Sequence, residues 1–435
     1  MIVRLFILNI FIGLVFAQSP DELLSSAKLN LDSGNLAKAE SEYNSALEMD
    51  PTFAPAYVGL AKVAMRKGDL KQSGSLLKEA IDADPENKEF RQEFEELSEL
   101  NTLMSKGIRS MKNGDIDNAF ESFRVAYEKF PQYPESVFNM GLANFRNKDY
   151  DEAVNYFKKT IAINPDHKNA LTAIKNVAKN YFNKGNQLYK RGDLEGALSS
   201  YDEVLNVDKT FYQAHFQIGV IQSKMGNKDL AVGSYEKSIQ INPQFYKAFF
   251  ALGLAKSSMN DTEGALESLQ KAIDIYPGYD KAYGAMGDIY IQQKDYDRAK
   301  QTLKMATTVN PNYSKGYANL GVIYSEEENW NQAISSLEMA VALNERDAMS
   351  FFRLSGAHNM NGDCDSALDA ARKSTELKNR FGGAWFELGI AEWCNGSGNK
   401  AGALNAFEKA RGDRAWRKMA EYEIDKVKNP QKYVK

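Results

Sequence analysis

The sequence contains little cysteine, histidine or tryptophan. Its 435 residues include two cysteines, three histidines and four tryptophans, and the formal net charge is −4. A charge this close to zero gives no sign of a nucleic-acid-binding surface or of an acidic disordered tail. The remaining composition, 43% hydrophobic and 26% charged, is that of an ordinary folded protein. Charge and composition therefore exclude several function classes without naming a partner.

The three histidines, His167, His215 and His358, lie far apart in sequence and have no cysteine or carboxylate at ligand spacing. A zinc site is therefore not expected. His215 and His358 occupy the large-residue positions 4 and 11 of their units and are most simply packing residues. No glycine-rich phosphate loop and no nucleophile elbow occur. We expect no metal, no cofactor and no catalytic residue, so the chain is predicted not to be an enzyme.

Long apolar runs are absent except at the N-terminus. Arg4 gives the first residues a positive charge, and residues 5–16 are mostly apolar and end before Ala17. About twelve apolar residues fall short of the roughly 20 that span a bilayer. We therefore predict that residues 1–17 are a signal peptide cleaved after Ala17, with an uncleaved membrane anchor as the alternative. No cysteine follows as in a lipoprotein signal, and the expected destination is the periplasm or the exterior of the cell.

Small residues recur along the chain with one fixed interval. Alanines lie 34 residues apart at Ala197, Ala231, Ala265, Ala299, Ala333 and Ala367. Glycines keep the same interval at Gly219, Gly253, Gly287 and Gly321, and prolines do so at Pro243, Pro277 and Pro311. A period of this length indicates a repeat architecture in which each unit packs on the next.

Each repeat unit splits into two amphipathic helices joined by a short turn. Within residues 246–279, Phe249 and Leu252 share one helical face, and Leu269 and Ile273 share the next. The turns have the same chemistry in several units, a C-cap glycine followed by an N-cap aspartate. They read Lys-Gly-Asp (67–69), Asn-Gly-Asp (113–115), Arg-Gly-Asp (191–193) and Asn-Gly-Asp (361–363). Because residues 191–193 fit this turn, we interpret them as a helix connection and not as an adhesion motif.

The pattern resembles the tetratricopeptide repeat, which has a large residue at position 4, Leu at 7, Gly at 8, Tyr at 11, Ala at 20, an aromatic at 24, Ala at 27 and Pro at 32. Eleven units begin at Pro20, Ala54, Leu100, Pro134, Ala178, Tyr212, Tyr246, Asp280, Ser314, Ala348 and Gly382. The unit from Asp280 matches best, and the first unit and the last two match least. The resemblance implies an all-α fold, a right-handed α-solenoid of about eleven helical hairpins with a C-terminal capping helix.

Two inserts and a C-terminal segment divide the array. Residues 88–99 and 168–177 are extra, free of Gly and Pro, and helical in pattern, so each is expected to extend the helix that follows it. The predicted blocks are residues 18–87 with two units, 88–167 with two and 168–411 with seven. The inserts are either tolerated lengthening or deliberate bends that shape a site. Residues 412–435 contain the predicted cap, whose buried face comprises Trp416, Met419, Ala420, Ile424 and Val427.

The two cysteines fall at the same end of adjacent predicted helices. Cys364 begins a second helix and Cys394 ends the first helix of the next unit, 30 residues later. In an exported chain this arrangement favours a disulfide. The alternative is a pair of small buried apolar residues.

The resemblance also implies that positions 2, 5, 6, 9, 12 and 13 of each unit line a concave groove. Phenylalanine recurs at position 5, including Phe352 and Phe386. The predicted peptide-binding residues are Phe138, Asn139, Lys179, Phe182, Asn183, Phe216, Gln217, Lys247, Phe250, Lys281, Lys315 and Asn319. Amides are suited to bind a peptide backbone, phenylalanines its side chains and lysines its carboxylates. The alternative is that the phenylalanines and amides belong to the ordinary repeat consensus.

These features favour a non-catalytic scaffold or assembly factor of the cell envelope that binds a protein or peptide, with an acidic or C-terminal segment as the expected ligand. A different class is a polysaccharide-handling array, similar to the periplasmic tetratricopeptide scaffolds of alginate and cellulose export. Such an array is expected to present more tryptophan than this chain contains. A third alternative, the repeat half of a glycosyltransferase complex, requires its catalytic part on a separate chain.

Overall fold

The computed structural model describes residues 18–396 and 398–433, and these residues form helices without any strand. The predicted signal peptide, residues 1–17, lies outside the described residues. The chain divides between Lys209 and Thr210 into two compact units, unit 1 and unit 2. This division coincides with neither insert, because both inserts lie inside unit 1.

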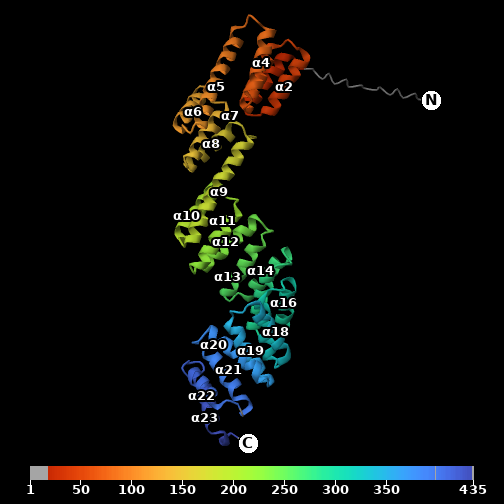
Figure 1. Cartoon of the computed structure of the whole chain (residues 1–435). Helices are drawn as coiled ribbons and strands as arrows, with labels where there is room; N and C mark the ends of the chain where they lie inside the picture. The colour runs from red at the N-terminus through yellow and green to blue at the C-terminus, as the bar shows by residue number, and fades with distance from the viewer. Residues whose placement is uncertain (1–17, 397, 434–435) are drawn as a thin grey trace, which may run out of the picture. The chain divides into compact units, whose positions relative to one another are not determined.

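Unit 1 contains five helical hairpins, each a first and a second helix that pack together, in chain order (Figure 1). Its helices are α1 (Pro20–Asp32), α2 (Leu36–Met49), α3 (Ala54–Lys67), α4 (Leu70–Ala83), α5 (Lys88–Lys112), α6 (Ile116–Lys129), α7 (Pro134–Arg146), α8 (Tyr150–Ile163), α9 (Lys168–Arg191) and α10 (Leu194–Val207). The inserted residues form the N-terminal parts of α5 and α9, which have 25 and 24 residues. Phe90 and Leu97 of the first insert are buried in the core of this unit.

Unit 2 contains six hairpins and a further helix, again with each helix packed on the next. Its helices are α11 (Tyr212–Lys224), α12 (Lys228–Ile241), α13 (Tyr246–Ser258), α14 (Thr262–Ile275), α15 (Asp280–Gln292), α16 (Tyr296–Val309), α17 (Ser314–Glu326), α18 (Trp330–Leu343), α19 (Ala348–Asn361), α20 (Cys364–Leu377), α21 (Gly382–Trp393), α22 (Lys400–Arg411) and α23 (Arg417–Lys428). Two short 3₁₀ helices, η1 (Cys394–Gly396) and η2 (Pro430–Lys432), follow α21 and α23. The fold is thus an all-α array of hairpins, as the sequence predicts.

The last helix, α23, packs on α22 as the predicted cap. Ala420, Ile424 and Val427 are buried there. Met419, which the sequence assigns to the same face, is 50% exposed, so that assignment is wrong. In a helix Met419 lies about 100° from Ala420, which turns it out of the contact.

The turn inside each hairpin has one residue in the left-handed region at the same repeat position, position 15. In six of the units up to that from Ala348 this residue is a glycine, as in Gly192 with φ +86°. Asp193 then caps α10, since its Oδ1 accepts a hydrogen bond from the backbone N–H of Gly196 at 2.9 Å. The other units place Lys148, Asn260, Lys294 or Glu328 at this position with positive φ. The turn geometry is therefore kept even where the side chain disfavours it.

A close contact between the two helices fixes each hairpin. In most units the glycine at position 8 of the first helix faces the large side chain at position 24 of the second. A Cβ on Gly219 would lie only 2.6 Å from Cε1 of Tyr235. The same contact pairs Gly253 with Leu269 and Gly389 with Phe407, the latter two positions further along its longer unit. Tyr235, Leu269 and Phe407 are buried, and each fills the space that a Cβ of the facing glycine would occupy.

We predict opposite effects for two glycine-to-alanine changes in adjacent helices. Gly219→Ala inserts a methyl group into a filled contact and is expected to lower the free energy of unfolding by about 1–3 kcal/mol. Gly233→Ala in α12, where a Cβ meets nothing within 4 Å, is expected to raise it by about 0.5–1 kcal/mol. Urea denaturation measures both, and equal effects of the two changes would contradict the packing described.

Candidate functional site

The predicted groove residues of unit 1 differ in how much surface they offer. Phe138 is buried, with its ring centroid 5.6 Å from that of Phe157 and 4.9 Å from that of His167. The amide of Asn139 donates a hydrogen bond to the backbone oxygen of Glu135 in its own helix, at 2.6 Å. These two side chains are therefore engaged within the fold. Lys179 and Asn183 on α9 are exposed, and Phe182 is half-buried with its ring 5.5 Å from Tyr201.

The predicted phenylalanines of unit 2 are half-buried. The Phe216 ring lies 5.8 Å from Tyr235 and 5.1 Å from Phe245, and the Phe250 ring lies 5.1 Å from Tyr279. Gln217 is half-buried beside Phe216 in α11, whereas Lys247 and Lys281 are exposed. Each phenylalanine thus packs on an aromatic neighbour and leaves part of its ring accessible.

Two of the predicted residues are held by a carboxylate that the sequence reasoning did not single out. Lys315 Nζ lies 2.6 Å from Asp288 Oδ2, and Asn319 Nδ2 donates to Asp288 Oδ1 at 2.6 Å. Asp288 occupies position 9 of the preceding unit, one of the groove positions. Asp288 can be found from the sequence when position 9 of one unit is compared with positions 2 and 6 of the next. The positive charge of Lys315 is consequently compensated within the protein.

A cavity of about 460 Å³ lies on the first-helix face near the end of unit 2. It is lined by Val322, Ser325, Glu326, Trp330, Phe352, Arg353, Gly356, Ala357, Asn359, Met360, Phe386, Glu387, Ile390 and Glu423. These residues belong to the first helices α17, α19 and α21, with Trp330 from α18 and Glu423 from α23. Of these residues, the sequence predicts only Phe352 and Phe386, as repeated position-5 aromatics. Arg353 and Glu387 occupy position 6, where other units have amides.

The aromatic wall of this cavity is held by the C-terminal segment. The Phe386 ring lies 5.1 Å from Trp416 and 5.6 Å from Phe407, and the Phe352 ring lies 5.8 Å from Trp416. Trp416 directly precedes α23, so the cap also positions the two phenylalanines. A preformed apolar cavity with a few polar groups is the usual form of a ligand site.

Glu387 is a half-buried charged group that lines the cavity. Asn359 Nδ2 donates to its Oε2 at 2.8 Å and to its backbone oxygen at 3.1 Å. Burial raises the pKa of the Glu387 carboxyl to about 7, and the hydrogen bond from Asn359 opposes this rise. The side chain therefore gains and loses its proton near neutral pH.

Arg353 is the basic residue among those lining the cavity. Burial lowers the pKa of its guanidinium, and the carboxylate of Asp347 counteracts this through space. Asp347 itself caps α19, where its side chain accepts hydrogen bonds from Ser350 Oγ and the backbone N–H of Met349. Within the described part of the chain, no carboxylate forms an ion pair with Arg353 within 4.0 Å.

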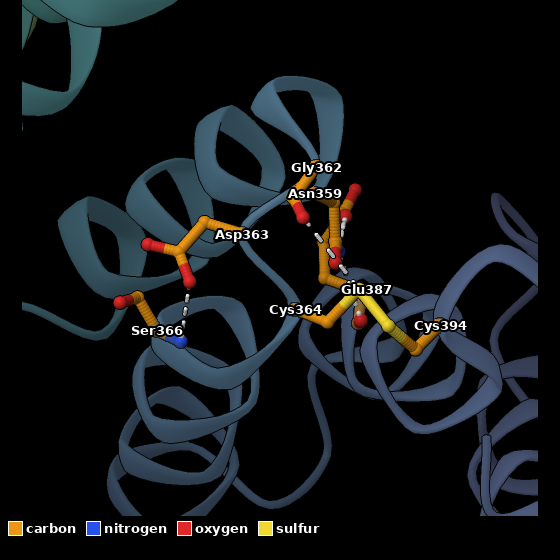
Figure 2. Close-up of a disulfide and its surroundings, with 7 residues drawn as sticks. All are labelled: Asn359, Gly362, Asp363, Cys364, Ser366, Glu387 and Cys394. Atoms are coloured by element: carbon orange, nitrogen blue, oxygen red, sulfur yellow. Dashed lines mark hydrogen bonds between the residues drawn. A yellow bond between two sulfur atoms is a disulfide. The ribbon is translucent and has the colours of Figure 1, made fainter.

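The two cysteines lie next to this region. Cys364 is the first residue of α20 and Cys394 directly follows α21, and their Sγ atoms are 2.09 Å apart, as in a disulfide (Figure 2). Figure 2 shows Asn359 and Glu387 in the surroundings of this pair. The link joins the start of α20 to the end of α21, the helix that carries Phe386 and Glu387.

Two of the histidines have structural roles. His167 Nδ1 accepts a hydrogen bond from the backbone N–H of Ala170 and thereby caps α9, while its Nε2 lies 2.8 Å from Glu135 Oε1. His358 lies in α19 with Nδ1 3.3 Å from Asp363 Oδ2. Across the described residues, no group of three or more His, Cys, Asp or Glu side chains is arranged to hold a metal ion. In the same part of the chain, no helix is both long and apolar enough to cross a membrane.

Family models described as tetratricopeptide or TPR repeats match residues 30–92, 134–167, 185–226, 212–245, 257–321 and 317–349. Together these ranges span more than half of the chain. The chain belongs to the tetratricopeptide repeat family. The matched ranges contain hairpins of both units, including α17 and α18 beside the cavity.

Individual relatives of this tetratricopeptide repeat chain are distant. TPR repeat-containing protein MJ1428 of Methanocaldococcus jannaschii is 26% identical over 162 residues, covering 28% of this chain and 29% of the relative. Tetratricopeptide repeat protein 6 of Homo sapiens is 23% identical over 155 residues, covering 31% and 30%. The chain thus spans less than a third of the length of these curated relatives. Among solved structures, that of the APC/C hetero-tetramer Cut9–Hcn1 is 13% identical, with TM-score 0.44 and coverage of 94% and 96%.

We predict that Glu387 makes stability fall as pH rises. Between its unfolded pKa of 4.5 and its folded pKa of about 7, the folded chain keeps a proton that the unfolded chain releases. Stability therefore decreases across this window, by up to roughly 3 kcal/mol, and is flat above it. Glu387→Gln removes this contribution, so the variant is expected to match wild type near pH 4.5 and to exceed it at pH 8.

Thermal unfolding followed by circular dichroism between pH 4.5 and 8 measures the difference between the two proteins. Glu338→Gln on α18, an exposed position, is the matched control and is expected to change stability little at any pH. Parallel pH profiles for wild type and Glu387→Gln would show that Glu387 does not titrate as described.

Proposed function

We propose that the chain is a non-catalytic scaffold that binds a segment of another protein on the first-helix face of unit 2. The cavity of about 460 Å³ carries this proposal, because consecutive first helices supply most of its lining. Proteins built from tetratricopeptide repeats bind other proteins or peptides, which supports the same reading. An extended segment lying across α17, α19 and α21 would place one of its side chains in the cavity.

The exposed lysines of unit 2 indicate that part of the bound segment is negatively charged. Lys247 and Lys281 lie at position 2 of successive units and are exposed. They are suited to attract an acidic stretch or a C-terminal carboxylate in the part of the bound segment that lies over α13 and α15. Lys315 is not included among these lysines, because its ion pair with Asp288 already compensates its charge.

The tryptophans favour a peptide over a polysaccharide as the ligand. Glycan binding would need exposed aromatic platforms, but Lys409 Nζ lies 3.8 Å from the ring centroid of Trp385, and Trp385 Nε1 donates to Asn379 at 2.8 Å. Trp416 packs on Phe386. Trp330 is the tryptophan that lines the cavity.

Photo-crosslinking tests the proposed binding face. A benzophenone amino acid replaces Met360, which lines the cavity and is 65% exposed, or Met339 of α18, which is 44% exposed and does not line it. We expect cross-links to an extended segment of another protein from position 360 and none to that segment from position 339. Equal cross-linking from both positions, or from position 339 alone, would contradict the proposal.

We further propose that the scaffold works in the cell envelope, in the periplasm or outside the cell, after cleavage following Ala17. The oxidising surroundings would keep the Cys364–Cys394 pair as a disulfide. Its 30-residue separation gives a loop whose closure stabilises the fold by about 3–4 kcal/mol on chain entropy.

The disulfide predicts a redox-dependent stability difference. The double variant Cys364→Ser, Cys394→Ser is expected to unfold at lower urea concentration than oxidised wild type, by about 3–4 kcal/mol in free energy. With reducing agent present, wild type and variant are expected to agree. Mass spectrometry of the exported protein without reduction provides a direct check, with Gln18 at the N-terminus and a mass 2 Da below that of the dithiol. Two free thiols in exported protein would refute the disulfide.

A further inference from the structure

We propose that the cavity between α17, α19, α21 and α23 receives a basic side chain, arginine or lysine, of the bound segment, with Glu387 as its acceptor. This inference rests on the proposed function and names the chemistry of one position in the ligand. It is distinct from the acidic stretch proposed for Lys247 and Lys281, which lie on α13 and α15.

The carboxyl of Glu387 is incompletely paired. Its Oε2 accepts the hydrogen bond from Asn359, and among the described residues its Oε1 has no hydrogen-bond donor. No positive group contributes to its pKa, which burial alone raises. Burial removes part of the hydration of this carboxyl, and the ammonium or guanidinium of a ligand would compensate for the loss.

The charged residues that line the cavity are three glutamates and one arginine. Glu326 from α17, Glu387 from α21 and Glu423 from α23 approach it from three helices. Glu423 also forms an ion pair with Lys426 at 3.4 Å, in which the Glu423 side chain is 12% exposed and the Lys426 side chain is 42% exposed. The basic residue Arg353 interacts through space with Asp347. The part of the cavity near Glu387 is therefore complementary to a cation.

Much of the remaining lining is apolar or aromatic. Phe352, Phe386 and Trp330 line the cavity, and aromatic rings attract cations and stack with guanidinium groups. Val322 and Ile390 provide apolar contact for the methylene stem of an arginine or lysine. An acidic side chain would fit this lining poorly, because it would bring a further negative charge to Glu326, Glu387 and Glu423.

Small-molecule titration of the mature chain, residues 18–435, tests the proposal. The probes are Nα-acetyl-arginine amide, its neutral isostere Nα-acetyl-citrulline amide, and Nα-acetyl-glutamic acid amide. Methionines labelled with ¹³C at the methyl group report binding by NMR, with Met360 at the cavity and Met339 on α18 as the internal control. We expect the arginine probe to shift the Met360 signal saturably, about tenfold more tightly than citrulline, and to leave Met339 unchanged.

Glu387→Gln is the matched variant, because it keeps the size of the side chain and an oxygen for Asn359 but removes the charge. We expect it to weaken the arginine probe by about tenfold, whereas Glu338→Gln on α18 has no effect. Binding to wild type is expected to be roughly tenfold tighter at pH 8 than at pH 6, as Glu387 ionises. This pH dependence should disappear in Glu387→Gln. Its loss would assign the effect to Glu387 and not to Glu326, Arg353 or Glu423, which line the same cavity.

Each contrary outcome refutes the proposal. Equal binding of the arginine and citrulline probes would show that the positive charge is not recognised. Tighter binding of the glutamic acid probe would show that Arg353, and not Glu387, recognises the ligand. If no probe shifts Met360 while position 360 still cross-links a partner, the basic side chain is refuted and the binding face stands. If position 360 cross-links nothing, the proposed function itself fails.

Discussion

The contact between a glycine backbone and a large side chain is the constraint on which the structure depends. In the hairpin of α11 and α12, Gly219 leaves the space that Tyr235 fills, and Gly389 does the same for Phe407 in the hairpin of α21 and α22. Each contact directs position 8 of a first helix toward its own second helix. Positions 5, 6 and 9 consequently lie on other parts of the first helix, where Phe386, Glu387 and Ile390 line the cavity.

The cavity of unit 2 combines rigid support with uncompensated charge. Trp416 holds Phe352 and Phe386, and the cysteine pair joins α20 to the end of α21, so the walls are fixed from two sides. Within these walls burial raises the pKa of Glu387 and lowers that of Arg353. Both shifts show that burial disfavours the charged form of the side chain, which costs stability. Groups with pKa values perturbed in this way are typical of functional sites.

Periodicity predicts the hairpins well because the close-packed positions accept few residues. For this reason the same residue types recur from unit to unit at the positions that Gly219, Ala231 and Tyr235 occupy. The insert at residues 88–99 is predictable as helix because Phe90 and Leu97 keep the helical interval. The site is harder to predict, because its charges are not part of the repeat. Asp288 is found only when one unit is aligned with the next, and Glu387 only when position 6 is allowed to be something other than an amide. Met419 was misplaced, since a cap packs along one side only.

Hydroxyl-radical footprinting with and without the bound partner tests the central claim most directly, because it needs no substitution. Met360 on α19 is 65% exposed at the cavity, whereas Met305 on α16 and Met339 on α18 are 43% and 44% exposed on second helices. If the partner binds the first-helix face, oxidation of Met360 should fall strongly while that of Met305 and Met339 stays constant. Protection of Met305 and Met339 with Met360 unchanged would contradict the account.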